Sequence, residues 1–182
     1  HILILVKSYS DGSGKKVNLL ESVTDLYAWY KSLVGQLKTN PQIFKPTVEK
    51  LVAGKTSNEE KVKAIYYWVQ DNIRYIAYEN GIAGFKPDEA QNVFEKKFGD
   101  CKGMANLTKE MLKVAGFDAR LTWIGTSIIK YDYSIPSLSV DNHMICTVIL
   151  DGKKVYLDGT EDYCAFGDFA ERIQNRPVLI ED

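Results

Sequence analysis

The sequence predicts an α+β fold in which N-terminal helices pack on an antiparallel β-sheet. Apolar residues recur at helical spacing from residue 24 to residue 115, and the pattern then changes to the alternation of strands. An Asp151-Gly152 pair separates two of the later apolar runs, as in a tight hairpin turn. Helices followed by strands are typical of α+β domains, whereas parallel sheets need the two to alternate.

Composition limits the chain to one domain and excludes some partners. Its 182 residues are 45% hydrophobic, which suffices for a single core. The formal net charge of -1 gives no long-range attraction to nucleic acid or anionic lipid. No apolar run approaches the roughly 20 residues that a membrane-spanning helix needs. We therefore expect no nucleic-acid partner and no membrane span in this chain, and its oligomeric state stays open.

The first residues are predicted to be a strand that leaves an upstream part of a longer protein. The chain begins without a methionine, and residues 2–7 form an apolar, strand-like run. Ser10-Asp-Gly-Ser-Gly14 follows as a turn or flexible joint. We expect this start to continue from a longer protein.

Start and stop signals mark the predicted helices. The clearest is Ser57-Asn-Glu-Glu60, a capping box in which serine and glutamate satisfy each other's backbone donors. Pro87 suits a first helical turn, Asp100 can cap the next helix, and Gly116 ends it. The expected helices span residues 24–37, 46–52, 58–75, 87–98 and 101–115.

The later part of the chain predicts three strands, at residues 119–124, 143–150 and 155–157. The connection Thr126–Asp141 between the first two is polar and contains Tyr131, Tyr133 and Pro136. A connection of this length is often functional, so it is our candidate for a substrate-facing loop.

Cys101 is the candidate nucleophile because it follows Gly99-Asp100 at the predicted start of a helix. Free backbone N–H groups and the positive end of the helix dipole favour a thiolate there. The N–H of Cys101 could also donate to a developing oxyanion. The alternative is a small buried hydrophobic residue, and helix position alone does not decide between the two.

His143 and Asp158 are predicted to meet across a hairpin. With a two-residue turn at Asp151-Gly152, Leu150 faces Lys153, and His143 and Asp158 become diagonal neighbours on one face. A one-residue bulge would separate them, and either could instead be a structural residue bonded to local backbone. Together with Cys101 they fit a thiol nucleophile, a base, and a carboxylate that orients the base.

The remaining candidate residues are expected to have structural roles or to border the site. Cys146 lies on the face opposite His143 and is read as core packing, and Cys164 as structural. Tyr75 and Tyr78 precede the loop at residues 81–85 and could border the nucleophile or its oxyanion. Three Cys and two His without CxxC, HxH or HxxxH spacing argue against a structural zinc site.

These motifs resemble the transglutaminase-like superfamily, a branch of the papain-like thiol enzymes. The resemblance rests on Phe98-Gly-Asp-Cys-Lys-Gly103, on Asn142-His143 and on Tyr156-Leu-Asp-Gly-Thr160. Trp68-Val-Gln-Asp-Asn-Ile-Arg-Tyr75 is similar to the family's preceding helix. Two positions depart from the pattern. Gly103 stands where many members have an acidic residue, and Gly159 stands where they have proline or alanine.

The resemblance implies a papain-like, transglutaminase-like core with its nucleophile at a helix N-terminus and with Cys101, His143 and Asp158 as catalytic triad. A bacterial branch with an N-terminal β domain is the best comparison. Residues 1–22 would then be strand and linker left from that domain, and residues 23–182 the transglutaminase-like domain. An exported location, periplasmic or at the cell envelope, is favoured, and a cytoplasmic one stays open.

The expected function is that of a cysteine-dependent acyl-transfer enzyme acting on a protein or peptide substrate with a carboxamide or peptide bond. It would pass through a thioester intermediate and need no cofactor or metal. A peptidase or amidase is favoured over a cross-linking enzyme because the chain lacks a calcium-type acidic cluster. The alternative is a non-catalytic protein-, peptide- or glycan-binding module of the same fold. An acetyltransferase would need an acyl-CoA pocket, and no basic or Gly-rich segment supplies one.

Overall fold

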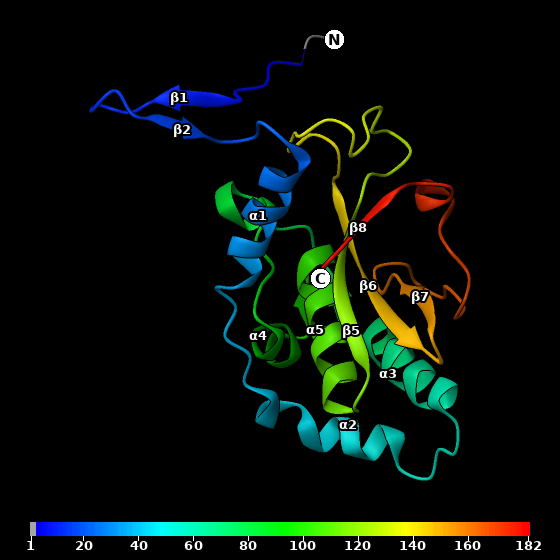
Figure 1. Ribbon diagram of the computed structural model, residues 1–182. Helices are drawn as coiled ribbons and strands as arrows, with labels where there is room; N and C mark the ends of the chain where they lie inside the picture. Colours follow the sequence, from blue (N-terminus) through cyan, green and yellow to red (C-terminus); the bar gives the residue numbers. More distant parts are fainter. Residues whose placement is uncertain (1–2) are drawn as a thin grey trace.

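A four-stranded antiparallel sheet with the strand order β7-β6-β5-β8 forms the centre of the fold (Figure 1). The computed structural model describes residues 3–182. The strands are β5 (Asp118–Ile124), β6 (His143–Leu150), β7 (Lys153–Leu157) and β8 (Val178–Ile180). The predicted α+β class and antiparallel sheet are confirmed, and β8 adds a short strand that the sequence pattern did not indicate.

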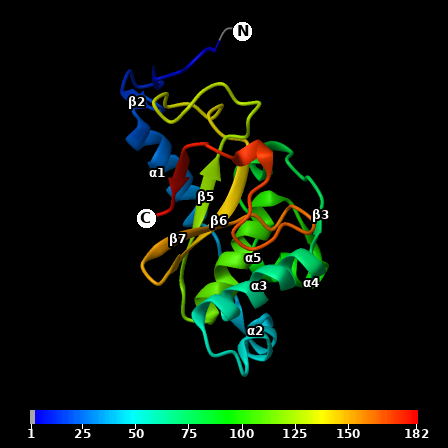
Figure 2. The same cartoon turned by 90° about the vertical axis from the view of Figure 1, so that its right-hand side faces the viewer.

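Helix α5 (Cys101–Val114) is the central helix and packs against β5 and β6 (Figure 2). Three helices surround it: α2 (Lys45–Val52), α3 (Asn58–Asn72) and α4 (Ala90–Lys96). Helix α1 (Val23–Val34) contributes Leu26 and Tyr30 to a buried cluster with Ala105 of α5 and Leu121 of β5. None of the helices within residues 3–182 combines the length and apolarity needed to cross a membrane.

The predicted capping box at Ser57 is present and begins α3, but this helix ends at Asn72 rather than near Tyr75. Ile73 is already extended, and the two following residues form β3 (Arg74–Tyr75). This strand pairs in parallel with β4 (Phe98–Gly99), so Tyr75 lies beside Gly99. The helix therefore stops early in favour of a pairing that brings residue 75 next to the start of α5.

The N-terminal strand prediction is wrong for residues 3–7, which are not in a strand; residues 1–2 lie outside the described part of the chain. The strands are instead β1 (Ser8–Ser10) and β2 (Lys16–Asn18), which pair around the predicted turn. This hairpin projects from the body of the molecule (Figure 1). Among the described residues, the apolar run at residues 3–7 has no strand beside it. An apolar pattern alone does not form a strand without such a partner.

Two other helix boundaries differ from the prediction. Pro87 precedes α4, which begins at Ala90 with the extended residue Glu89 as its N-cap. Leu37 lies beyond the end of α1. Three short 3₁₀ turns complete the elements: η1 (Pro41–Ile43), η2 (Gly81–Gly84) and η3 (Glu171–Ile173).

The β6–β7 hairpin has the predicted register. Asp151 and Gly152 both have positive φ, at 50° and 78°, as a two-residue primed turn requires. Leu150 faces Lys153, and the pairing continues to Cys146 and Leu157. Residue 158 is therefore the first after the edge strand and lies near the beginning of β6.

Candidate active site

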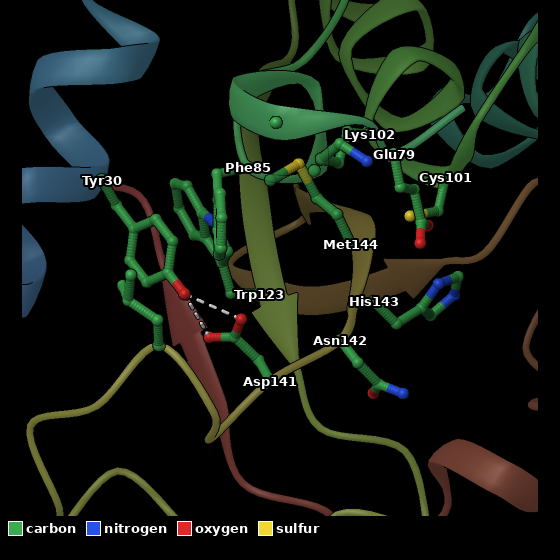
Figure 3. Close-up of a pocket in the computed structure, with 13 residues that line it drawn as sticks. Tyr30, Glu79, Phe85, Cys101, Lys102, Trp123, Asp141, Asn142, His143 and Met144 are labelled. Carbon is green, nitrogen blue, oxygen red and sulfur yellow. Dashed lines mark hydrogen bonds between the residues drawn. The ribbon is translucent and has the colours of Figure 1, made fainter. Parts of the chain in front are cut away.

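The structure brings Cys101, His143 and Asp158 together from three different elements. Cys101 is the first residue of α5, His143 is the first of β6, and Asp158 directly follows β7. The Nε2 atom of His143 lies 2.8 Å from Oδ2 of Asp158. Figure 3 shows Cys101 and His143 on the same side of the cleft, and a side-chain hydrogen bond with Cys101 contributes to the raised pKa of His143. All three residues are buried, with exposed fractions of 3%, 6% and 3%.

Asp100 positions Cys101 by capping α5. One of its carboxylate oxygens accepts the Gly103 N–H at 2.9 Å, and the other bonds the Lys102 ammonium in a buried ion pair. The Cys101 N–H lies in the first turn, where a helix offers no acceptor of its own. It is therefore free to face a carbonyl oxygen bound near the thiol.

Gly103 is explained by the packing of α4 on α5. A Cβ added at this position would lie 3.0 Å from a methyl group of Val93 and 3.5 Å from an Asp100 carboxylate oxygen. An acidic side chain here would also approach Asp88. At Gly159, a Cβ would meet Val69 at 3.4 Å, which is ordinary contact. The two departures from the family pattern thus differ in their surroundings, since Gly103 is the more crowded of the two positions.

His143 is held by the strand pairing and by its neighbour. It pairs with Ile124 of β5, and the Asn142 amide accepts the Thr126 N–H at 2.9 Å and donates to the Thr126 hydroxyl at 3.0 Å. Burial lowers the pKa of His143, but hydrogen bonds to Asp158 and Cys101 outweigh it and raise the pKa to about 9. An imidazolium is thus favoured beside the sulfur at neutral pH.

Asp158 is kept ionised by its bonds. Burial alone would raise its pKa, but the bond from His143, with bonds from the Thr160 N–H (3.1 Å) and hydroxyl (2.7 Å), holds the pKa below its ordinary value. A guanidinium nitrogen of Arg172 donates to the Thr160 hydroxyl at 3.0 Å and lies 3.7 Å from the carboxylate. The same nitrogen pairs with Glu161 at 2.5 Å.

Helix α3 secures the backbone that carries Asp158. The Tyr66 hydroxyl lies 3.2 Å from the Asp158 carbonyl oxygen and 3.3 Å from that of Cys164. The Gln70 amide donates to the Glu161 carbonyl at 2.8 Å. Both side chains come from a helix distant in sequence, so the position of the carboxylate depends on the packed core.

A cleft of about 310 Å³ opens beside Cys101 and His143. Its walls combine aromatic residues, two acidic residues and residues of the segment before β6 (Figure 3). Lys102 also lines it, but its ammonium is bonded to Asp100. The lining residues are Tyr30, Glu79, Gly81, Gly84, Phe85, Cys101, Lys102, Trp123, Leu138, Asp141, Asn142, His143 and Met144.

The two tyrosines predicted near the site differ in position. Burial raises the pKa of Tyr75 to about 12, and the nearby Cys101, Glu79 and Asp100 side chains contribute to this rise. Tyr78 instead lines a separate cavity with Ile76 and Phe98. Neither belongs to the lining of the main cleft.

The other cysteines lie away from the cleft. Cys146 is fully buried in the core, where burial raises its pKa to about 12. The sulfur of Cys164 lies 3.4 Å from the Asp168 carbonyl oxygen. In the described part of the chain, no group of three or more His, Cys, Asp or Glu side chains is arranged to hold a metal ion.

Sequence reasoning missed most of the cleft wall. The predicted substrate loop does reach it, through Leu138 and Asp141. Tyr30, Phe85 and Trp123 come from separate elements and carry no motif that would have connected them. Arg172 was also missed, because its bond to the threonine of the Asp-x-Thr motif is a contact that no local sequence signal indicates.

Comparison with known families and structures agrees with this geometry. The family model of the transglutaminase-like superfamily matches residues 45–154, which include Cys101 and His143. A search of curated proteins found no match.

Solved structures share the fold. A candidate protease from Parabacteroides distasonis matches 75% of this chain and 26% of its own, with 19% identity and a TM-score of 0.61. A candidate cysteine protease from Cytophaga hutchinsonii matches 85% of this chain and 61% of its own, with 16% identity and a TM-score of 0.53. The chain thus spans less than two thirds of either neighbour. Its α+β core and the family match show that it belongs to the transglutaminase-like superfamily.

Proposed function

We propose that the protein is a cysteine-dependent acyl-transfer enzyme that acts on peptide or carboxamide bonds. The observation that carries the proposal is the 2.8 Å contact between His143 Nε2 and Asp158, with the Cys101 side chain near the same imidazole ring (Figure 3). A buried carboxylate, an imidazole and a thiol at a helix N-terminus are the parts of an activated nucleophile.

In the first half of the reaction, the Cys101 sulfur attacks the carbonyl carbon and its proton resides on His143. The carbon–oxygen double bond opens to an oxyanion, which the Cys101 N–H stabilises. His143 then gives its proton to the leaving nitrogen, the carbon–nitrogen bond breaks, and an amine and a thioester remain. Asp158 holds the ring in orientation and stabilises the imidazolium.

In the second half, His143 takes a proton from the incoming nucleophile as that nucleophile attacks the thioester. The carbon–sulfur bond breaks, and the proton returns to the sulfur. Water as the nucleophile releases an acid, whereas a primary amine forms a new amide bond. We favour water, in keeping with the neighbours named as proteases and with the small domain.

Residues 1–22 remain our proposed link to an upstream β domain, consistent with a hairpin that projects from the body (Figure 1). Such a domain would reach the cleft from the side of the Thr126–Asp141 segment, because residues 3–6 share a cavity with Ser137, Leu138 and Ser139.

The test is turnover of a proteome-derived peptide library, with and without the amine probe 5-(biotinamido)pentylamine. We expect new peptide termini or deamidated side chains, detected by mass spectrometry, with the parent protein and neither with Cys101→Ala. Cys164→Ala is the matched control and should retain activity. Biotin incorporation without new termini or deamidation would favour transfer over hydrolysis, and the absence of all three products with the parent would contradict the proposal.

A further inference from the structure

We propose that the cleft binds a basic side chain of the substrate, lysine or arginine, with Asp141 as its counterion. The subsite is the distal end of the cleft, formed by Tyr30, Trp123 and Asp141 away from Cys101 (Figure 3). The inference deepens the proposed function, because it names the substrate class that the same cleft takes.

The charges that face the cleft are acidic. Glu79 and Asp141 line it, while the Lys102 ammonium is bonded to Asp100 and its charge is thereby offset. The positive charge of His143 is matched by the Asp158 carboxylate. A cationic substrate group entering the cleft would therefore meet a favourable potential.

Asp141 is partly buried yet has no cationic partner within residues 3–182. Its carboxylate accepts hydrogen bonds only from hydroxyls, those of Tyr30 (2.8 Å and 2.9 Å to the two oxygens) and Tyr133 (3.2 Å). Burial raises its pKa to about 6 despite these bonds. A carboxylate can accept further bonds, and an ammonium or guanidinium would supply both donors and charge.

The walls of the distal end suit a cation. The rings of Tyr30 and Trp123 pack with their centroids 4.7 Å apart and their planes tilted by 32°, and Phe85 also lines the cleft. Aromatic faces attract lysine and arginine through the cation–π interaction. They also cover the apolar stem of such a side chain.

Trp123 gives an independent sign of a missing ligand. The side chain lines the cleft with an exposed fraction of only 5%. Its indole Nε1 has no hydrogen-bond partner among the described residues. Buried donors in native proteins are normally paired. An indole N–H can only donate, so it needs an acceptor such as a peptide carbonyl. A peptide with a basic side chain offers both that acceptor and a cation for Asp141.

Binding can be tested without turnover in Cys101→Ala by ¹H–¹⁵N NMR of the indole signals. The chain has three tryptophans, and Trp123→Phe identifies the relevant signal. The probes are Nα-acetyl-lysine N-methylamide and its arginine, norleucine and glutamate counterparts. Pentylamine, which has the ammonium but no carbonyl, distinguishes a peptide from a free amine.

We expect the lysine and arginine probes to shift the Trp123 signal and to bind about 10-fold more tightly than norleucine. Asp141→Asn should abolish this preference, because asparagine keeps an acceptor for the tyrosines but not the charge. Asp132→Asn removes the same charge from an exposed position in the same loop and should preserve the preference.

Equal binding of lysine and norleucine, or a preference that survives Asp141→Asn, would overturn the subsite. Equally tight binding of pentylamine would overturn the peptide assignment in favour of an amine. A preference found in a protein whose Cys101 proves unreactive would leave the subsite standing and remove the proposed chemistry. Thermal melting of each variant verifies that it is folded.

Discussion

The imidazole of His143 and the carboxylate of Asp158, which are 15 residues apart in sequence, meet at 2.8 Å because the β6–β7 hairpin turns without a bulge. The contact is buried, so its electrostatic effect is not screened as it would be at the surface. Each group stabilises the charged form of the other, and this mutual stabilisation determines the pH behaviour of the site.

Replacing Asp158 with asparagine should lower the pKa of His143 from about 9, because the charge that favours the imidazolium is lost. We expect turnover to fall by about 10²- to 10⁴-fold. NMR titration of His143 measures the shift. Asp162→Asn, an exposed position four residues away, is the control, and an unchanged His143 titration in Asp158→Asn would contradict the assignment.

The same pair makes stability depend on pH. A histidine pKa raised on folding stabilises the native state fully below the unfolded pKa of about 6.5, and this contribution is lost as the pH rises through about 9. Asp158→Asn should therefore reduce the free energy of unfolding more at pH 6 than at pH 10. Urea unfolding at both values tests this, and an equal loss at the two would disagree with it.

Asp141 has the opposite effect on stability. Its pKa is raised from 3.8 to about 6, so its ionisation disfavours the folded state; the cost is absent below pH 3.8 and complete above about pH 6. Asp141→Asn should therefore stabilise the protein at pH 8 relative to pH 4, by about 1–3 kcal/mol. A parent–variant difference that does not change with pH would show that the carboxyl is not perturbed.

Arg172 should act as a positioning residue through Thr160. Arg172→Gln leaves the Thr160 hydroxyl without its donor and removes a positive charge 3.7 Å from Asp158. We expect a several-fold loss of kcat and an acid limb of the pH profile displaced upward, with KM little changed. Glu171→Gln, its exposed neighbour, is the control. A fall in stability without a displaced pH profile would indicate a purely structural role.

Gly125 should not tolerate a side chain. A Cβ there would lie 2.5 Å from the Val140 carbonyl oxygen, where the two ends of the substrate-facing loop approach each other. Gly125→Ala should cost about 1–3 kcal/mol of stability, measured by urea unfolding. Gly12→Ala, which meets nothing within 4 Å, should cost little. Comparable losses in both variants would refute the crowding.

The sequence could predict those parts of the fold that rest on local signals. The capping box at Ser57, the cap at Asp100 and the turn at Asp151-Gly152 each act over a few residues. The hairpin register then followed from the alternation of side chains, which is why His143 and Asp158 could be predicted to meet.

The rest depends on contacts distant in sequence. Strand β8 has three residues, and its pairing with β5 could not be read from so short a run. The cleft wall joins Tyr30, Trp123 and Asp141 through tertiary packing, which leaves no period in the sequence. The start of α4 also differs from the prediction, since Pro87 lies ahead of the helix and Glu89 is its N-cap.

The most direct test of the account is the rate of iodoacetamide alkylation at Cys101, resolved by mass spectrometry from Cys146 and Cys164, in the parent protein and in His143→Ala. At pH 6 we expect Cys101 to react at least about 10-fold faster than Cys146 or Cys164, and we expect His143→Ala to abolish this advantage. Slow labelling of Cys101, or labelling at the same rate in both proteins, would contradict an activated Cys101–His143 pair.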